Sequence, residues 1–159
     1  MINNKYSDDS LVSQPTINKE NFLKKEVNVL MIEDNQLIQL IHNKILTDLG
    51  CQVDIASSGE EALLMIENHY DLILLDIGLP GISGTDVAIK FRGHKNHKEV
   101  RMIALTSHSD VDTRKLCFCS GIEEVLNKPI DIKKLETVIY QLKKQYFFYT
   151  YLEGGLYGF

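Results

Sequence analysis

The sequence predicts an α/β fold, in which a five-stranded parallel sheet is covered by helices on both faces. Three observations support this prediction. Short apolar runs of strand length alternate along the chain with helical stripes of apolar residues. Most of these runs are almost continuously apolar, as in strands that are buried on both faces. Polar or charged residues follow most runs, at the point where parallel strands place their ligands.

Length, composition and charge fit one soluble domain. The chain has 159 residues, 44% of them hydrophobic, and a formal net charge of -5, which lacks the basic excess that nucleic-acid binding requires. It contains no apolar run of membrane-spanning length and begins without the apolar segment of a secretory signal, so a cytoplasmic protein is expected. Residues 1–25 are polar and lack periodicity, which predicts a mobile arm or linker.

The first α/β unit begins with residues 27–32, which have the composition of a buried strand. This strand ends directly in Glu33 and Asp34. Apolar residues recurring every three or four positions then predict a helix over 35–49, and Gly50 provides its end.

The second unit leads into the most apolar strand of the chain. Residues 52–56 alternate between apolar and polar, which favours a strand nearer the sheet edge. Ser58 and Glu61 have the spacing of a capping box and open a helix that is expected to reach about residue 69. Four consecutive apolar residues and an aspartate then predict a buried third strand over 72–76.

The next unit has clear helix signals and a buried strand. Ser83 and Asp86 resemble a capped helix start, and Gly93 ends the apolar stripe that follows. Residues 101–106 predict a fourth buried strand that ends in a threonine. A weaker pattern predicts a helix over 110–120, with Val111, Leu116 and Cys117 as its candidate apolar residues.

The last unit ends the sheet and begins the most regular helical stripe of the chain. Residues 123–127 predict a short fifth strand, which Lys128 and Pro129 close because proline cannot continue a central ladder. Asp131 is placed to cap a final helix whose apolar stripe extends over 132–146.

Five polar side chains are expected to converge at one edge of the sheet, because the carboxyl ends of parallel strands meet there. Closely packed carboxylates repel one another unless a cation intervenes, and an oxygen-rich cluster suits Mg²⁺. A carboxylate at the centre of such a cluster can attack phosphorus, while an ammonium offsets the charge of the transferring group and a hydroxyl contacts a phosphate oxygen. The five residues are Glu33, Asp34, Asp76, Thr106 and Lys128.

These strand-end residues lie in motifs that resemble the receiver domain of two-component response regulators, in the CheY-like superfamily. The resemblance extends from about Val27 to Tyr146, and Gly78 to Gly81 is similar to the receivers of hybrid kinases and phosphorelays. The matching motifs are residues 31–35, 74–81, 104–107 and 127–129.

The resemblance implies a flavodoxin-like (βα)5 three-layer sandwich with strand order 2-1-3-4-5. It implies that Asp76 accepts a phosphoryl group from a histidine kinase or phosphotransfer histidine, with Thr106 as the switch hydroxyl and Lys128 as the phosphate-binding ammonium. The protein would then be a bacterial signalling phosphoprotein that acts through protein contacts rather than a turnover enzyme. The Mg²⁺ ligands implied are Glu33, Asp34, Asp76 and the backbone carbonyl of Gly78.

One residue departs from the family pattern. Many receivers carry an aromatic switch residue three positions before the lysine, where this chain has Val125. Valine cannot swing as a ring does, so the coupling between Thr106 and that position is expected to differ. The alternative interpretation is a binding module of the same fold that acts without phosphorylation.

Three other kinds of site are less consistent with the sequence. His94 and His97 have a spacing that could bind a metal, but they follow Gly93 among lysines, which favours an exposed loop. A haloacid-dehalogenase-like phosphatase needs a second acid where this chain has Gly78. A nucleotide-binding Rossmann unit needs a glycine-rich turn after the first strand, where this chain has residues 33–35.

The predicted receiver domain spans residues 26–146, and an aromatic C-terminal extension follows over 147–159. Seven of the thirteen aromatic residues lie in the last fourteen positions. Because contiguous aromatic patches often mark interfaces, the extension is expected to pack on its own domain, to remain disordered, or to join two copies in a homodimer. Gly154 and Gly155 are expected to end the last helix.

Overall fold

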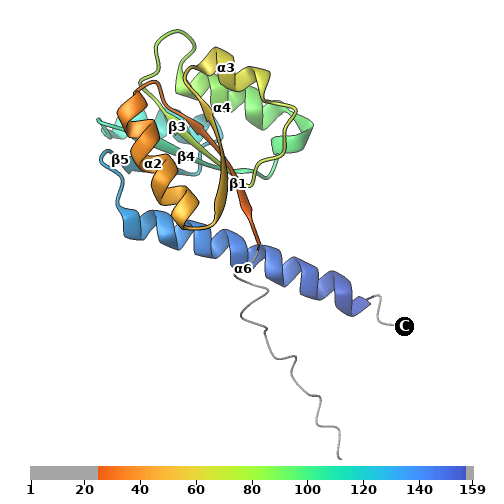
Figure 1. The fold of residues 1–159 in the computed structure, drawn as a ribbon. Coiled ribbons are helices and arrows are strands. Elements are labelled where there is room, and N and C mark those ends of the chain that lie inside the picture. Colours follow the sequence, from red (N-terminus) through yellow and green to blue (C-terminus); the bar gives the residue numbers. More distant parts are fainter. Residues whose placement is uncertain (1–24, 157–159) are drawn as a thin grey trace, which may run out of the picture.

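The structure is a computed structural model that describes residues 25–156 (Figure 1). The polar arm predicted over residues 1–25 therefore lies outside the described residues except for Lys25, as do the last three residues of the predicted aromatic extension. Within the described range, no helix combines the length and apolar character needed to cross a membrane.

Five parallel strands form a single sheet in the order β2-β1-β3-β4-β5, which confirms the predicted topology. Every residue of β3 is buried, in agreement with its continuous apolar run, and β2 is an edge strand as its alternation predicted. The strands are β1 (Val27–Ile32), β2 (Cys51–Ala56), β3 (Leu72–Asp76), β4 (Arg101–Thr106) and β5 (Glu124–Asn127).

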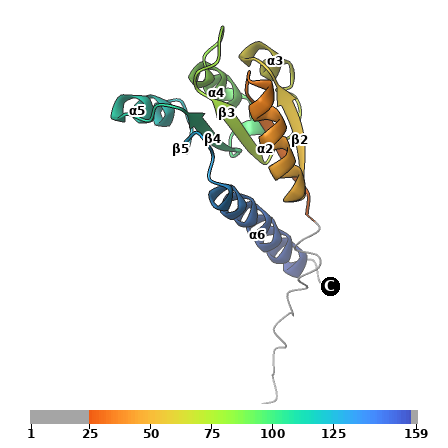
Figure 2. The same cartoon turned by 60° about the vertical axis from the view of Figure 1, so that its left-hand side comes forward.

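Helices cover both faces of the sheet and complete a three-layer sandwich (Figures 1 and 2). One face packs against α3, α4 and α5, which contribute Ala62, Phe91 and Cys117 to its core. The other packs against α2 and α6, which contribute Leu46 and Leu135. The helices are α2 (Gln36–Asp48), α3 (Gly59–Leu64), α4 (Gly84–Gly93), the 3-10 helix η1 (Lys95–His97), α5 (Val111–Cys119) and α6 (Ile132–Leu156).

The helix ends follow the capping signals in the sequence. Ser58 accepts a hydrogen bond from the Glu61 backbone N–H at 3.0 Å, and the Glu61 carboxylate accepts one from the Ser57 N–H at 2.6 Å. Ser83 caps α4, as predicted. Gly50 follows α2 with φ of 78°, a left-handed conformation that glycine adopts without strain.

Two helices differ from their predictions. Regular α-helix in α3 ends at Leu64 rather than near residue 69, because the chain continues in tighter turns such as Met65 N–H to Ala62 carbonyl. In α5 only Cys117 of the three candidate core residues is buried, whereas Val111 and Leu116 are exposed. The weak apolar pattern of this short helix was insufficient to identify its buried face.

The last helix is longer than predicted. It continues through Gly154 and Gly155 to Leu156, so the prediction that these glycines end it was wrong. Glycine costs about 1 kcal/mol relative to alanine inside a helix, but it retains its backbone N–H and does not break the hydrogen-bond ladder. Figures 1 and 2 show that the helix continues past the edge of the sheet.

The prediction of an exposed loop around His94 and His97 was wrong for His97, whose side chain is fully buried. Its Nε2 donates to the Ile66 carbonyl at 2.8 Å, and its ring packs against Phe91 with centroids 5.0 Å apart. The nearby Arg92 guanidinium binds the backbone carbonyls of the same segment. The segment is therefore part of the fold at the amino edge of the sheet.

Candidate functional site

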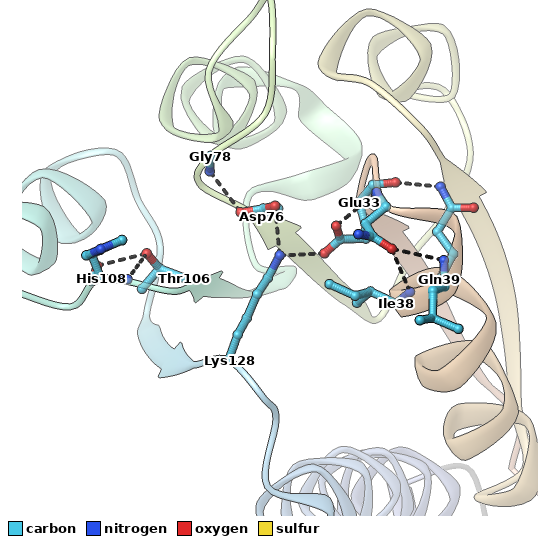
Figure 3. A network of polar contacts seen from close by, with 10 residues as sticks. Glu33, Ile38, Gln39, Asp76, Gly78, Thr106, His108 and Lys128 are labelled. Atoms are coloured by element: carbon cyan, nitrogen blue, oxygen red, sulfur yellow. Dashed lines mark hydrogen bonds and ion pairs between the residues drawn. The ribbon is translucent and has the colours of Figure 1, made fainter.

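The carboxyl ends of the strands lie level with one another. Asp76 of β3 pairs with Leu105 of β4, and Thr106, one residue further along β4, pairs with Asn127 of β5. The residues at the carboxyl ends of the strands, or directly after them, therefore emerge at the same edge of the sheet (Figure 3). Glu33 and Asp34 follow β1, whereas Lys128 follows β5.

Lys128 holds two of the predicted site residues together. Its Nζ donates to Glu33 Oε2 at 2.7 Å and to Asp76 Oδ2 at 2.8 Å (Figure 3). Burial alone would lower the pKa of Lys128, but the hydrogen bonds and attraction from Asp76 and Glu33 outweigh burial and raise that pKa. The ammonium is therefore firmly charged and lies between two buried carboxylates.

The three carboxylates form a compact acidic cluster. Oxygen atoms of Glu33, Asp34 and Asp76 lie within 4.8 Å of one another. Asp34 is exposed, whereas the other two are buried. With Lys128 the group carries a formal charge of about −2, which one divalent cation would balance. Its all-oxygen donor set fits a hard cation rather than a soft metal.

The turn after Asp76 fixes the direction of that carboxylate. The Gly78 N–H donates to Asp76 Oδ1 at 2.8 Å, while Lys128 engages Oδ2 (Figure 3). The start of α4 also lies close behind this turn: a Cβ on Gly84 would lie 2.3 Å from the Asp76 carbonyl oxygen. Only glycine permits this approach, so α4 and the end of β3 are packed backbone to backbone.

Thr106 lies at the same edge of the sheet, but its hydroxyl binds the backbone of His108 rather than the acidic cluster. Its Oγ1 donates to the His108 carbonyl at 2.8 Å and accepts from the His108 N–H at 3.1 Å. Figure 3 shows the threonine hydroxyl directed to its own loop. The structure thus brings both Glu33 and Asp76 into direct contact with Lys128 and leaves Thr106 beside them.

Two residues near the site were missed by sequence reasoning. The Asn35 backbone N–H donates to Glu33 Oε1 at 3.1 Å, and the Asn35 side chain caps α2. Its position before a helical stripe is a cap signal that could have identified it. Gln39 donates to the Glu33 carbonyl at 2.5 Å and to Ser57 Oγ at 3.1 Å, contacts that no sequence signal indicates.

Val125 is buried, and it packs in the core cluster that includes Ala104 and Ile122. It also lines an open hollow of about 250 Å³ on the outer side of β5, together with Arg114 and Lys134. At this position, three residues before Lys128, the chain has a small aliphatic side chain, whereas many receivers have an aromatic one.

Comparison with known proteins agrees with this geometry. The response regulator receiver domain family matches residues 29–140. The aerobic respiration control sensor protein ArcB of Escherichia coli (strain K12) is 33% identical over 115 residues, which are 71% of this chain and 15% of ArcB. This chain therefore spans a small part of that relative's length.

Solved structures show the same fold. Chemotaxis protein CheY4 of Vibrio cholerae matches with a TM-score of 0.70 and 23% identity, over 74% of this chain and 99% of that one. The receiver domain of sensor histidine kinase PA1611 from Pseudomonas aeruginosa PAO1, solved with magnesium coordinated in its active site cleft, matches with a TM-score of 0.69 and 28% identity. That match covers 76% of this chain and 99% of the other. On its fold, its strand-end residues and its family match, this chain belongs to the response regulator receiver domains.

Proposed function

We propose that the protein is a phosphoacceptor of a two-component or phosphorelay pathway and that Asp76 receives the phosphoryl group. The contact of Lys128 with both Asp76 and Glu33 carries this proposal, because it unites a carboxylate nucleophile with the charges that phosphoryl transfer requires. The donor is a phosphohistidine of a sensor kinase or phosphotransfer protein. We also propose that the protein acts in the cytoplasm, as the compartment in which it would meet such a donor.

In the transfer step, an Asp76 carboxylate oxygen forms a bond to phosphorus while the bond between phosphorus and the donor's histidine nitrogen breaks. The electron pair of that bond stays on the nitrogen. The departing imidazole is neutral because its other ring nitrogen already carries a proton. The Gly78 N–H holds the carboxylate in a fixed orientation. The Lys128 ammonium, already 2.8 Å from Asp76, is placed to donate a hydrogen bond to a phosphoryl oxygen after the transfer.

Glu33, Asp34 and Asp76, with the Gly78 carbonyl, would hold Mg²⁺. Their oxygen-rich chemistry and surplus negative charge support this assignment. Bound there, the cation would neutralise charge on the transferring phosphoryl group. The buried Glu33 carboxylate is already fixed by Lys128 and Asn35, so the site is largely built before a cation arrives.

Thr106 would act as the switch. Its hydroxyl now bonds to His108, and a phosphoryl group on Asp76 would offer it a charged acceptor. Movement of the hydroxyl toward that acceptor would release the loop before α5. A local charge change would thereby become a change of surface that a partner protein can read.

The first turns of α2 offer a docking surface for the phosphodonor. Leu37, Leu40 and Ile41 are 65%, 67% and 50% exposed on a helix that begins at Gln36, two residues after Asp34. Residues three and four apart lie on one side of a helix, so these side chains form an apolar patch beside the acidic cluster. A helical phosphotransfer partner could cover it while presenting its histidine to Asp76.

Mass spectrometry tests the phosphoacceptor function. The protein, incubated with Mg²⁺ and acetyl phosphate, should gain the mass of one phosphoryl group, and Asp76→Asn should gain none. A purified histidine kinase offered as a second donor covers the case of slow small-molecule transfer. No gain on wild type from either donor, or an equal gain on Asp76→Asn, would contradict the proposal.

A phosphorylation-independent binding module is the second candidate, and Val125 is the observation that favours it. Without a ring at this position, the coupling of Thr106 to the outer side of β5 lacks its usual partner. The same phosphorylation assay separates the two candidates, because a protein that takes up no phosphoryl group on Asp76 from either donor would leave only the binding module.

We further propose that the outer part of α6 joins two copies. Tyr146 and Phe148 are 51% and 61% exposed, and the helix runs on to Leu156. Light scattering should give a dimer mass for the full chain and a monomer mass for a chain ending at Lys144; equal monomer masses would contradict the dimer.

A further inference from the structure

We infer that the amino end of α3, residues 57–61, is a positioning element for the acidic cluster. It acts through the two loops that carry the cluster's carboxylates and Gly78, rather than as a catalytic group. The inference rests on the proposed function of that cluster. It is carried by two separate sets of contacts that begin in the same turn of α3 and reach different loops.

The first set of contacts reaches the loop after β1. The Glu61 carboxylate accepts the Ser57 N–H at 2.6 Å, which fixes the residue just before the helix cap. The Ser57 hydroxyl accepts a hydrogen bond from Gln39 Nε2 at 3.1 Å. That same amide nitrogen donates to the Glu33 carbonyl at 2.5 Å (Figure 3). The backbone of Glu33 is therefore tied through Gln39 to the start of α3.

The second set reaches the loop after β3, which carries Gly78. The Glu60 carboxylate accepts the Ile82 N–H at 3.1 Å. It lies directly over Gly81, where a Cβ would be only 2.7 Å from Glu60 Oε1. Gly81 also has φ of 79°, a left-handed conformation that favours glycine at this position.

The first residue of α3 packs against the same loop. A Cβ on Gly59 would lie 2.9 Å from the Ile82 carbonyl oxygen and 2.8 Å from Val87 Cγ2. This close approach holds the α3 terminus against the loop between Asp76 and α4. Glu60 and Gly59 thus fix one loop while Ser57 and Glu61 fix the other.

This arrangement matters because a metal site on loops binds well only when other contacts hold its ligands in place. The Gly78 N–H already orients the Asp76 carboxylate, so movement of the loop at Ile82 would displace both Gly78 and its partner. Loss of the Glu60 contact should therefore weaken Mg²⁺ binding and slow phosphorylation by between about three- and tenfold, the range expected for one hydrogen bond.

Charge provides a competing explanation, because Glu60 also adds a negative charge near a cation site. Two substitutions separate charge from position. Glu60→Gln removes the charge but retains a side-chain oxygen that can accept the Ile82 N–H. Glu60→Ala removes both. Glu136→Ala is the matched control, since it removes one exposed carboxylate from α6.

The experiment measures Mg²⁺ affinity by calorimetry and the initial rate of phosphorylation by acetyl phosphate at saturating Mg²⁺. Positioning predicts that Glu60→Gln and Glu136→Ala stay within about twofold of wild type, while Glu60→Ala loses three- to tenfold. Equal losses for Glu60→Gln and Glu60→Ala would assign the effect to charge and overturn the inference. Wild-type affinity in Glu60→Ala would overturn it as well.

A second measurement is independent of phosphorylation. Amide hydrogen exchange of the metal-free protein should show faster exchange at Ile82 and Gly78 in Glu60→Ala than in wild type, with Glu60→Gln close to wild type. Unchanged exchange in Glu60→Ala would refute the positioning role even if Asp76 is phosphorylated. If Glu60→Ala exchanges faster but wild type takes up neither Mg²⁺ nor phosphate, the contact of Glu60 with the loop is supported and the proposed function is rejected.

Discussion

The Thr106 hydroxyl and the His108 backbone bind each other in both directions: Oγ1 donates to the carbonyl at 2.8 Å and accepts from the N–H at 3.1 Å. The hydroxyl therefore closes a small turn between β4 and α5. A group that competes for this hydroxyl must break that turn. Under the proposed function, the contact would link phosphorylation of Asp76 to the start of α5 without any movement of the sheet.

Thr106→Ala should accept phosphate but fail to transmit it. Thr106→Ser keeps a hydroxyl and is the matched control. On phosphorylation, amide chemical shifts of residues 107–110 should change in wild type and Thr106→Ser and stay nearly constant in Thr106→Ala. If all three proteins show the same changes, the hydroxyl is not the link between Asp76 and α5.

Lys128→Met should destabilise the metal-free protein by about 1–3 kcal/mol, because it leaves the buried carboxylates of Glu33 and Asp76 without their shared donor. Mg²⁺ should restore more stability to this variant than to wild type, since the uncompensated charge is larger. Lys134→Met is the control: its pair with Glu124 is partly exposed and worth about 0–1 kcal/mol.

Urea unfolding with and without Mg²⁺ measures both effects. A loss in Lys128→Met no greater than in Lys134→Met would show that the two ion pairs contribute little to stability. An equal gain from Mg²⁺ in Lys128→Met and wild type would show that the cation does not replace the ammonium.

The sequence was sufficient to predict the fold and the convergence of the strand-end residues. Asp76 and Lys128 are 52 positions apart, yet their contact follows from the order of apolar runs and the rule that parallel strands end at one edge. Neither the strand order nor the shared edge depends on how a side chain is oriented. The proposed roles of these residues remain predictions.

The details that depend on side-chain direction could not be predicted. The bond from Thr106 to His108 depends on one rotamer, and the bridge made by Gln39 depends on the spacing of two loops. His97 was expected to be exposed because its neighbours in sequence are lysines, but a 3-10 turn directs its ring into the core. Local polarity gave no sign of that turn.

Gly84→Ala should destabilise the protein by at least about 2 kcal/mol and slow phosphorylation of Asp76. The new Cβ would lie 2.3 Å from the Asp76 carbonyl oxygen, a backbone atom that no rotamer change can move away. Gly93→Ala is the matched control at the other end of α4, where a Cβ meets no atom within 4 Å. It should leave stability unchanged or raise it by up to about 1 kcal/mol. Similar unfolding midpoints for the two variants would contradict the close approach of α4 to β3.

Stability should fall as the pH drops below about 6.5, and His97 should contribute to that fall. Burial, opposed by the bond to the Ile66 carbonyl and assisted by His94, His69 and Arg92, lowers the pKa of His97. The ring is therefore neutral in the folded protein, with Nε2–H donated to Ile66 and Nδ1 buried.

The sign of the pH effect follows from this lowered pKa. Above about pH 6.5 both folded and unfolded His97 are neutral, so its contribution is constant. Below that pH the unfolded chain binds a proton that the folded ring resists, and stability decreases by up to about 1.4 kcal/mol per pH unit until the folded pKa is passed. His42, whose pKa is lowered by burial and by Lys128, adds a slope of the same sign.

Urea unfolding of wild type and His97→Gln between about pH 7 and pH 5 measures the contribution of His97. Glutamine can still donate to the Ile66 carbonyl but does not titrate, so the variant should lose less stability than wild type over this range. His42→Leu should flatten the slope separately, because His42 lies on α2 on the other face of the sheet. Parallel pH profiles for wild type and His97→Gln would mean that the buried His97 ring is not the titrating group, and His42 would then be the candidate for the acid sensitivity.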